Sequence, residues 1–487
     1  MHVVIVGAYG SAGAAVADHL VDHVSHEIDR LTLVDDGEPG GGLCILRGCM
    51  PSKGILSAAA HRHQSRSDPR LDGRAPDLDL NSVIAKKDQH TAAFARHRRE
   101  QIDEYTERDG VELVEGTARF AADDVIELYE GRTVKAGKRG RFEHDIEPTR
   151  TIRADYTAVC TGSVVNVPTI PGIEEVGYRD SADLLDTTQL PDSAIIMGFG
   201  YIGMEMAPYL AEAGVDVTAI EHDDRPLDQA HPDFGDEALE IYREEFGIDI
   251  LTGTREQEVE ETARGGVRLT CESQAGSERV IEADELFLFT GRRPNVQGLG
   301  LENTSIEPER GYVRDTMQAA DDGTTFFVGD VNGKEPVVHV AKEQGELAAE
   351  NIVAHAQGKR PEKFEFTPHH VMFAGAGIYP YARVGHTAET ARAELVEEPV
   401  VVRRRAEDDG VFELKNAERG LAELTVARDG TVVGYQGLHY HADTMAKTMQ
   451  VVVESGMDVD DVPDRSFHPT LPEILDGLLR EAKAELA

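Results

Sequence analysis

Two glycine-rich turns, each between an apolar run and a helical pattern, constrain this chain more than any other feature. In the clearer one, Gly198, Gly200 and Gly203 have G-x-G-x-x-G spacing, and the next apolar run, residues 215–220, leads into Glu221. Strand, glycine turn, helix and strand in this order predict a dinucleotide-binding βαβ unit. Such a turn brings the backbone N–H groups of a helix N-terminus close to a pyrophosphate.

An N-terminal copy of the unit begins at residue 2. Gly7, Gly10 and Gly13 follow an apolar run there, and the second run reaches Asp35. The spacing departs from the motif: the glycines are evenly spaced, or the turn is a degenerate form in which Ala8 takes the place of the first glycine. An ordinary tight βα turn is the alternative. Two such units predict two bound dinucleotides and an α/β fold.

The end of the second strand carries information about the nucleotide. An acidic residue there hydrogen-bonds the ribose 2′-hydroxyl and disfavours a 2′-phosphate. Glu221 therefore favours NADH over NADPH, although His222 and Arg225, just beyond it, could offer a phosphate positive charge.

The charge of the chain limits its partners and its setting. Of the 487 residues, 49 are Lys or Arg and 90 are Asp or Glu, which gives a formal charge of −41. Such an excess excludes nucleic-acid binding through broad basic surfaces, because phosphate binding needs many Lys and Arg. Concentrated salt would screen the self-repulsion, so the composition is typical of a halophilic protein. Disorder is excluded, since 40% of the residues are hydrophobic and fall in periodic blocks.

Location and surface features are also predicted. No apolar run approaches the ~20 residues of a membrane span, and the N-terminus leads directly into a strand pattern without a signal sequence. We therefore expect a cytoplasmic protein that binds neither membrane nor nucleic acid. A basic stretch from Arg132 to Arg141 is interpreted as a solvated hairpin loop rather than a docking patch.

Two of the four cysteines lie five residues apart. Cys44 and Cys49 follow a run of glycines and are expected to open a helix, where the N-terminus stabilises a thiolate. Two buried core cysteines are the alternative, and a metal site is disfavoured because no second ligand pair follows. Cys160 and Cys271 are expected to be small core residues.

The segment GGLCILRGCMPSK, residues 41–53, resembles the redox-active signature of the pyridine nucleotide-disulfide oxidoreductases, such as glutathione reductase and dihydrolipoamide dehydrogenase. Further segments resemble that family's motifs in the right order: CTGS at 160–163, TGRRPN at 290–295, VGDVNG at 328–333, HVAKEQGELAAENI at 339–352 and FHPTLPE at 467–473. The resemblance covers nearly the whole chain.

The resemblance implies an α/β fold with two Rossmann-like domains and an α+β C-terminal dimerisation domain. The FAD-binding domain would occupy residues 1–172 and 287–360, and the NAD(P)-binding domain residues 173–286. The C-terminal domain, 361–487, is expected to contain alternating strands, among them 412–417, followed by helices 441–456 and 470–485.

The resemblance also assigns catalytic roles. NAD(P)H would reduce FAD, with Tyr201 gating the nicotinamide position, and electrons would then pass to a Cys44–Cys49 disulfide. Cys49 would be the charge-transfer thiolate and Cys44 the thiol that attacks a disulfide substrate. His468, oriented by Glu473, would be the acid/base supplied by the partner subunit of a homodimer, and Lys53 would pair with Glu205 near the flavin. The expected cofactor-binding residues are Gly7, Gly10, Gly13, Asp35, Gly42, Lys53, Thr161, Gly162, Gly198, Gly200, Tyr201, Gly203, Glu221, His222, Gly291, Arg292, Gly329 and Asp330.

The substrate depends on where the chain departs from the family. Arg47, between the cysteines, is either a site for a carboxylate-bearing thiol or a salt-bridged surface residue. Mercuric reductase is disfavoured because its C-terminal cysteine pair is missing, and lipoamide is weakened because Ser466 stands where lipoamide dehydrogenases carry a second His. Together with the halophilic composition, the resemblance to glutathione reductase implies reduction of bis-γ-glutamylcystine. NADPH is the reductant expected from the resemblance, although Glu221 makes NADH possible. A dihydrolipoamide dehydrogenase and a non-catalytic redox-sensing flavoprotein are the alternatives.

Overall fold

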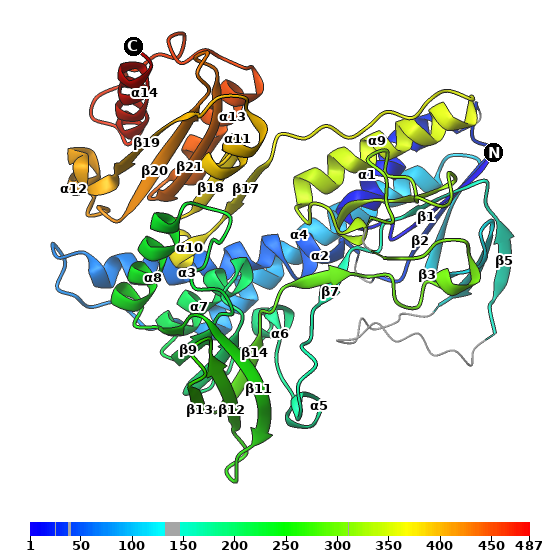
Figure 1. The fold of residues 1–487 in the computed structure, drawn as a ribbon. Helices are drawn as coiled ribbons and strands as arrows, with labels where there is room; N and C mark the ends of the chain where they lie inside the picture. Colours follow the sequence, from blue (N-terminus) through cyan, green and yellow to red (C-terminus); the bar gives the residue numbers. More distant parts are fainter. Residues whose placement is uncertain (25, 38–39, 132–146, 310) are drawn as a thin grey trace. The chain divides into compact units, whose positions relative to one another are not determined.

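The computed structural model describes residues 1–487 except 25, 38–39, 132–146 and 310. The basic stretch from Arg132 to Arg141 therefore lies outside the described residues. The chain divides into two compact units, and each is built from several separate stretches of sequence (Figure 1).

The first unit comprises Met1–Ser52, Ala85–Asn166 and Gly291–Glu365 and contains a seven-stranded sheet. Its order is β16-β6-β1-β2-β3-β4-β5, parallel from β16 to β3 and antiparallel from β3 to β5. The strands of this sheet, with the small β7-β15 ribbon of the unit, are β1 (His2–Val6), β2 (Arg30–Asp35), β3 (Val111–Ala122), β4 (Val125–Glu130), β5 (Arg150–Arg153), β6 (Tyr156–Val159), β7 (Ser163–Val165), β15 (Arg292–Pro294) and β16 (Thr325–Phe327).

Both faces of this sheet are covered, as a strand of β-branched residues such as β1 requires. Val3 and Ile5 pack in one hydrophobic cluster with residues of α1 and α9, whereas Val4 and Val6 pack in another, because successive side chains of a strand point to opposite faces. The helices of the unit are α1 (Ser11–Leu20), η1 (Val21–His23), α2 (Gly42–Leu46), most of α4 (Leu80–Thr106), η2 (Leu301–Asn303), η3 (Gly329–Asn332) and α9 (Val338–Ala356).

The second unit comprises Lys53–Ile84, Val167–Thr290 and Phe366–Ala487 and contains three sheets. A parallel sheet of order β10-β9-β8-β14 forms the second dinucleotide-type fold, beside an antiparallel sheet β11-β12-β13. Their strands are β8 (Ser193–Met197), β9 (Asp216–Ile220), β10 (Asp249–Leu251), β11 (Thr254–Glu261), β12 (Val267–Ser273), β13 (Glu278–Ala283) and β14 (Glu285–Leu288). The helices in this part are α5 (Ile173–Val176), α6 (Ser181–Leu185), α7 (Tyr201–Glu212) and α8 (Pro232–Glu245).

The C-terminal part of this unit is a five-stranded antiparallel sheet of order β17-β18-β21-β20-β19 (Figure 1). Its strands are β17 (His369–Met372), β18 (Tyr381–Gly385), β19 (Val400–Arg405), β20 (Gly420–Val426) and β21 (Val432–His439). Its helices are α10 (Ala374–Gly377), α11 (Ala388–Glu394), η4 (Ala406–Asp408), α12 (Gly410–Lys415), α13 (Ala442–Glu454) and α14 (Glu473–Leu486).

One expected strand is wrong. Residues 412–417 were expected to continue the alternating strands, but helix α12 covers most of them. Asp409 caps this helix by accepting a hydrogen bond from the N–H of Val411, and Asn416 ends it in the left-handed conformation at φ 53°. Local capping therefore overrides the alternating pattern of the segment.

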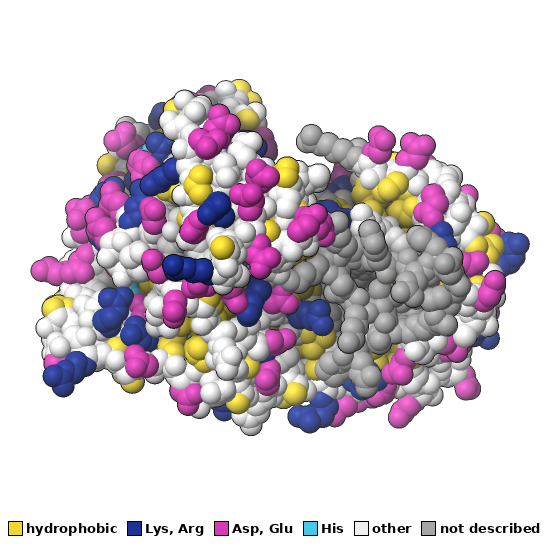
Figure 2. Space-filling view, turned by 90° about the horizontal axis from the view of Figure 1, so that it is seen from below, with side chains coloured by type: hydrophobic (Ala, Val, Ile, Leu, Met, Phe, Trp, Pro, Cys, Tyr) yellow, Lys and Arg dark blue, Asp and Glu magenta, His cyan; other side chains and the backbone are white. Residues whose placement is uncertain are grey.

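Acidic side chains are widely distributed over the face of the molecule shown in Figure 2. Figure 2 shows Asp and Glu side chains spread over the face it draws, with Lys and Arg between them. Within the described part of the chain, none of the helices combines the length and apolar character needed to cross a bilayer.

Candidate active site

The first glycine turn connects β1 to α1. Gly7 has φ +94°, and a Cβ at this position would lie 2.5 Å from the carbonyl oxygen of Cys160. A Cβ at Gly13 would lie 2.1 Å from the carbonyl oxygen of Gly7. These two glycines are therefore required by close backbone packing, while Gly10 is the N-cap of α1.

The second turn, between β8 and α7, repeats these contacts. Gly198 has φ +88°, and its Cβ would lie 2.6 Å from the carbonyl oxygen of Phe289. A Cβ at Gly203 would lie 2.3 Å from the carbonyl oxygen of Gly198, whereas one at Gly200 would meet nothing within 4 Å. Gly200 thus leaves open space at a helix N-terminus, which fits the approach of a pyrophosphate.

The acidic residues at the strand ends hold both turns. Asp35 accepts hydrogen bonds from the N–H groups of Tyr9 (2.8 Å) and Gly37 (2.7 Å). Glu221 accepts one from the N–H of Phe199 (2.7 Å). Burial raises the pKa of Asp35 to about 6, against the two backbone hydrogen bonds, which lower it. Each carboxylate therefore lies beside its own turn, where a ribose would lie.

The two cysteines belong to successive helices rather than to one. Cys44 lies within the short helix α2, and Cys49 is the first residue of α3 (Cys49–Ser67). Both are partly exposed. Arg98, from α4, lies close enough to Cys44 for their charges to interact, and burial lowers the pKa of its guanidinium. In general, a cation close to a cysteine favours the thiolate form.

Glycines shape the approach to the cysteines. Gly41 has φ +130° and Gly42 has φ +66°. A Cβ at Gly42 would lie 2.7 Å from Cα of Gly10, so the loop that carries Cys44 passes directly over the first glycine turn. Arg47, at the end of α2, is exposed and forms no ion pair with any residue that the structure describes.

Lys53 and Glu205 form the ion pair that the family resemblance implies. Nζ of Lys53 donates to both carboxylate oxygens of Glu205, at 2.7 and 2.8 Å. Glu205 also accepts a hydrogen bond from the N–H of Phe373 (3.0 Å), and the Lys53 ammonium lies 4.6 Å from the centre of the Phe373 ring. The pair therefore joins α3 and α7 in a partly buried contact.

A polar cluster surrounds Asp330. The hydroxyl of Ser163 donates to the Asp330 carboxylate (2.6 Å), and Arg292 donates from Nε to the same hydroxyl oxygen (2.8 Å). The Thr161 hydroxyl donates to the carbonyl of Asn295 (2.8 Å). Left-handed backbone at Gly162, Gly291 and Gly329 forms the turns between these groups.

His468 and Glu473 form a pair at the start of α14. Nδ1 of His468 lies 3.1 Å from both carboxylate oxygens of Glu473, which also accepts the N–H of Thr470 (2.8 Å). The Thr470 N–H, followed by His468, lowers the pKa of Glu473. The His468 side chain is 79% exposed, so Nε2 is the nitrogen available for proton exchange. Phe467, beside it, is 90% exposed.

Family comparison agrees with this set of features. Residues 1–345 match the family model for pyridine nucleotide-disulphide oxidoreductases, and residues 376–478 match the dimerisation domain of the same family. The chain belongs to the pyridine nucleotide-disulphide oxidoreductases. The predicted family and fold class are confirmed, and the family uses FAD and a pyridine nucleotide.

Individual relatives of this oxidoreductase differ in their substrates. A mercuric reductase of Streptomyces lividans is 30% identical over 442 residues, covering 88% of this chain and 86% of that protein. A dihydrolipoyl dehydrogenase of Halobacterium salinarum is 28% identical over 453 residues, covering 91% and 89%. The crystal structure of LpdA from Mycobacterium tuberculosis shares the fold, with a TM-score of 0.80, 22% identity and 99% of both chains covered.

Carboxylates contact the two side chains that lie just beyond the end of β9. His222 forms an ion pair with Glu256, and Arg225 forms one with Asp236 at 2.5 Å. Both side chains that the sequence offered as partners for a 2′-phosphate are therefore already engaged by carboxylates.

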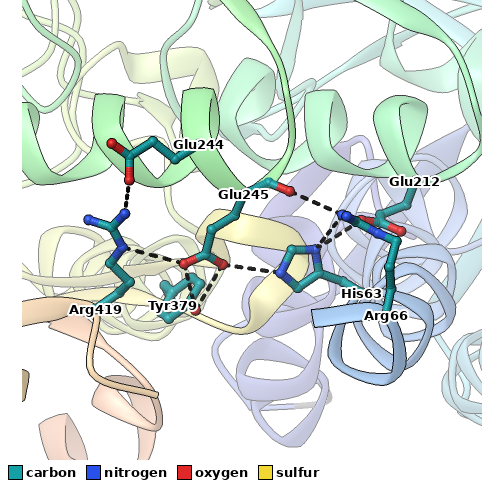
Figure 3. Close-up of polar contacts among 7 residues, drawn as sticks. All are labelled: His63, Arg66, Glu212, Glu244, Glu245, Tyr379 and Arg419. Atoms are coloured by element: carbon teal, nitrogen blue, oxygen red, sulfur yellow. Dashed lines mark hydrogen bonds and ion pairs between the residues drawn. The ribbon is translucent and has the colours of Figure 1, made fainter. Parts of the chain in front are cut away.

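Buried charges hold the far end of α3 in the oxidoreductase (Figure 3). Nδ1 of His63 lies 2.9 Å from Glu212 of α7, and Nε2 lies 3.1 Å from Glu245 of α8. Arg66 donates to Glu212 (2.7 Å), and the Tyr379 hydroxyl donates to Glu245 (2.9 Å). Burial lowers the pKa of His63, but the hydrogen bonds to the two carboxylates outweigh it and raise the pKa above its usual value. The helix that begins at Cys49 is thus tied to α7 near both of its ends.

Some of these residues were missed by the sequence analysis. Arg98 beside Cys44, Glu256 beside His222, and His370, which contacts Tyr201, come from segments far from the motifs in sequence. No local pattern marks them. Cys160 and Cys271 are buried, as expected, and burial raises the pKa of each thiol.

Proposed function

We propose that this chain is an FAD-dependent NAD(P)H:disulfide oxidoreductase that reduces a low-molecular-weight disulfide, bis-γ-glutamylcystine, in a salt-rich cytoplasm. One observation carries the proposal: Cys44 and Cys49 lie on successive helices, with Arg98 interacting with Cys44 and Lys53 one turn beyond Cys49 paired with Glu205. The domain limits 1–172, 173–286, 287–360 and 361–487 are part of the proposal.

The residues around the turns fit the two nucleotides. Gly7, Gly10, Gly13 and Asp35 would hold the FAD pyrophosphate and ribose, and Asp330 its ribityl chain. Gly198, Gly200, Gly203 and Glu221 would hold the nicotinamide dinucleotide, with Tyr201 over the nicotinamide position. When bound, FAD would relay electrons from the nicotinamide to the cysteine pair.

The proposed chemistry of the cysteines is a pair of thiol–disulfide exchanges. The Cys44 thiolate attacks one sulfur of the substrate, forming a mixed disulfide and releasing the first thiol. Cys49 then attacks the Cys44 sulfur as a thiolate, which breaks the mixed disulfide and leaves a Cys44–Cys49 disulfide. The second thiolate released takes up a proton from the solvent. Arg98 favours the attacking thiolate, and Lys53, paired with Glu205, keeps a positive charge close to Cys49 along α3.

His468 supplies the protons in this proposal. Its imidazolium protonates the first leaving thiolate, and Glu473 at Nδ1 fixes the ring and stabilises its charge. The exposure of His468 and Phe467, together with the dimerisation-domain match, supports a homodimer in which His468 serves the partner's cysteines.

We propose NADH as the reductant. The resemblance to low-molecular-weight disulfide reductases favours NADPH, but the contacts at the end of β9 favour NADH. Glu221 lies beside the second glycine turn, where it would bind the ribose hydroxyls, and His222 and Arg225 each contact a carboxylate. A 2′-phosphate would have to displace these ion pairs.

The choice of disulfide rests on charge and on the cysteine loop. A formal charge of −41 fits a salt-rich cell, and exposed Arg47 is a cation that a carboxylate-bearing disulfide would use. Dihydrolipoamide dehydrogenase is the second candidate, because such an enzyme from Halobacterium salinarum aligns over 91% of this chain. Mercuric reductase is the less favoured candidate, although such an enzyme from Streptomyces lividans aligns over 88% of this chain.

Steady-state assays in concentrated KCl would test the proposal. We expect turnover of bis-γ-glutamylcystine with NADH to exceed that of lipoamide, glutathione disulfide and Hg²⁺. Turnover of lipoamide without bis-γ-glutamylcystine would contradict the substrate. A Cys44→Ser variant should keep its flavin and lose disulfide reduction, with Cys271→Ser as the control; full activity of Cys44→Ser would contradict the role of Cys44.

A further inference from the structure

Tyr201 is held by a residue from outside its own βαβ unit. It is the first residue of α7, directly after Gly200, and is 42% exposed. Its hydroxyl lies 2.6 Å from Nε2 of His370, which belongs to β17 in the C-terminal antiparallel sheet. The residue that begins the helix after the second glycine turn is thus bonded to a strand 169 residues downstream.

His370 is itself fixed in place. Its ring centre lies 5.4 Å from that of Tyr201 and 5.7 Å from that of Tyr381. Tyr381 is fully buried, and its hydroxyl donates to Gln436 at 2.7 Å. His370 pairs with Arg383 in the β17–β18 register. The partly exposed Tyr201 therefore hydrogen-bonds to His370, whose position is fixed by strand pairing and by the buried ring of Tyr381.

We propose that His370 is a latch that holds Tyr201 in its resting position and thereby sets the affinity for the nicotinamide half of the dinucleotide. The inference rests on the proposed function, in which Tyr201 covers the nicotinamide position. To admit the nicotinamide ring, Tyr201 must exchange its bond to His370 for one to water. The fraction of molecules in which Tyr201 is released then limits the apparent affinity.

The latch should affect binding of the nicotinamide half of the dinucleotide and not of the ADP-ribose half, so the two ligands can be compared. ADP-ribose contains the ribose and pyrophosphate that the glycine turn and Glu221 would hold, but no nicotinamide. We therefore compare the Kd of NAD⁺ with that of ADP-ribose, by titration calorimetry on the FAD-loaded protein. NADP⁺ and 2′-phospho-ADP-ribose replace them if the assays above identify NADPH.

Five variants separate the latch from a general structural effect. His370→Leu and Tyr201→Phe each remove the hydrogen bond and should tighten NAD⁺ binding by about 3–10-fold. The double variant should bind NAD⁺ no more tightly than either single one. His370→Gln, which can still bond the Tyr201 hydroxyl, should restore affinity close to wild type. His369→Leu, on the same strand, is the control, because His369 contacts Thr367 and Gln450 instead. ADP-ribose should bind all of them equally.

Three results would overturn the latch. NAD⁺ affinity could be unchanged in His370→Leu, or weakened, which would make His370 a binding residue; or ADP-ribose affinity could shift as much as that of NAD⁺. If wild type instead bound neither dinucleotide nor ADP-ribose, the proposed function itself would fail, and that result is distinct from the other three.

Discussion

The two glycine turns share their backbone contacts and differ by one residue. Gly7 N–H donates to the carbonyl of Val34, as Gly198 N–H donates to that of Ile220. The third glycine of each turn then packs its Cα against the carbonyl of the first. The N–H that reaches the strand-end acid comes from Tyr9 in one turn and Phe199 in the other. The first turn therefore contains one extra residue, Ala8.

The helices behind these turns are supported in different ways. Helix α1 packs on α9 through small residues, and a Cβ on Gly345 would lie 2.9 Å from the carbonyl oxygen of Ala12. Helix α7 instead ends at Glu212, which is 3% exposed and accepts hydrogen bonds from Arg62, His63 and Arg66. The glycine contacts are thus a shared local requirement, whereas the support of each helix depends on distant segments.

The largest expected effect comes from removing the charge at the end of α7. Glu212→Gln should lower the free energy of unfolding by about 3–5 kcal/mol, because it removes the buried carboxylate that Arg62, His63 and Arg66 share. Denaturant unfolding of the FAD-loaded protein would measure it. Glu240→Gln is the control, since its pair with Arg419 is exposed and should be worth about 0–1 kcal/mol. If both variants lost the same unfolding free energy, Glu212 would not be the residue that supports the end of α7.

Glu212 and His63 together predict an acidic and an alkaline limit to the stability of the fold. Burial raises the pKa of Glu212, but its hydrogen bonds with His63, Arg66 and Arg62 outweigh this and lower the pKa to about 2. Its stabilisation is therefore present above pH ~4 and is lost as the pH falls towards 2. His63 has a raised pKa, so its contribution is complete below pH ~6.5 and is lost as the pH rises through its folded value. A His63→Gln variant should flatten the alkaline side of the stability profile.

The glycines should separate packing from ligand binding. In Gly13→Ala and Gly203→Ala the new Cβ meets backbone, so each should cost about 1–3 kcal/mol in unfolding free energy. Gly13→Ala should lose flavin, while Gly203→Ala should keep flavin and lose nicotinamide binding. Gly200→Ala, whose Cβ meets nothing, should weaken dinucleotide binding without loss of stability. Flavin content, NAD⁺ titration and unfolding curves would measure these effects, and a destabilised Gly200→Ala would contradict the comparison.

Nucleotide choice should depend on the acid of the second turn. Glu221→Ala removes the group expected to bind the ribose hydroxyls, so the ratio of kcat/KM for NADH to that for NADPH should fall by about 10–100-fold. Glu256→Gln, which releases His222 from its ion pair, should shift the ratio in the same direction by a smaller factor. An unchanged ratio in both variants would contradict the proposed recognition.

Asp35, the acidic residue beside the first turn, should make the folding stability fall as the pH rises. Because burial raises the pKa of Asp35 to about 6, ionising it costs folding free energy. In the flavin-free protein, its contribution to stability is complete below pH ~4 and is lost as the pH rises to 6 and beyond, by about 3 kcal/mol. Asp35→Asn should remove this slope from stability profiles measured between pH 4 and 7. A slope that persists in Asp35→Asn would assign it to another group.

The turns could be predicted because glycine positions follow from local backbone geometry. Gly7, Gly13, Gly198 and Gly203 each lie where a Cβ would meet backbone, and such requirements leave a readable spacing. Helix α12 was missed, although Asp409 and Asn416 are typical capping residues, because the alternation between them imitates a strand.

Contacts between distant segments leave no pattern in the sequence comparable to the glycine spacing. The Lys53–Glu205 pair was expected only through the family resemblance, and its partner Phe373 was not expected at all. His370 and Arg98 reach Tyr201 and Cys44 through the packing of α7, β17 and α4 with their neighbours. Their roles require the three-dimensional structure, because side-chain charge alone does not select one Arg among many.

The smallest expected effect concerns Tyr9, which stands where the second turn has Phe199. Tyr9 is 1% exposed, and its hydroxyl has no hydrogen-bond partner among the described residues. Burial raises its pKa to about 12, so the hydroxyl stays protonated.

Tyr9→Phe makes the first turn chemically like the second and removes an unsatisfied polar group. The flavin-free protein should gain about 1 kcal/mol in unfolding free energy. Flavin affinity should stay unchanged, with Phe199→Tyr as the matched reverse change, which should destabilise. If Tyr9→Phe instead lowers flavin affinity several-fold, the hydroxyl bonds the cofactor, and the two turns differ in ligand recognition as well as in length.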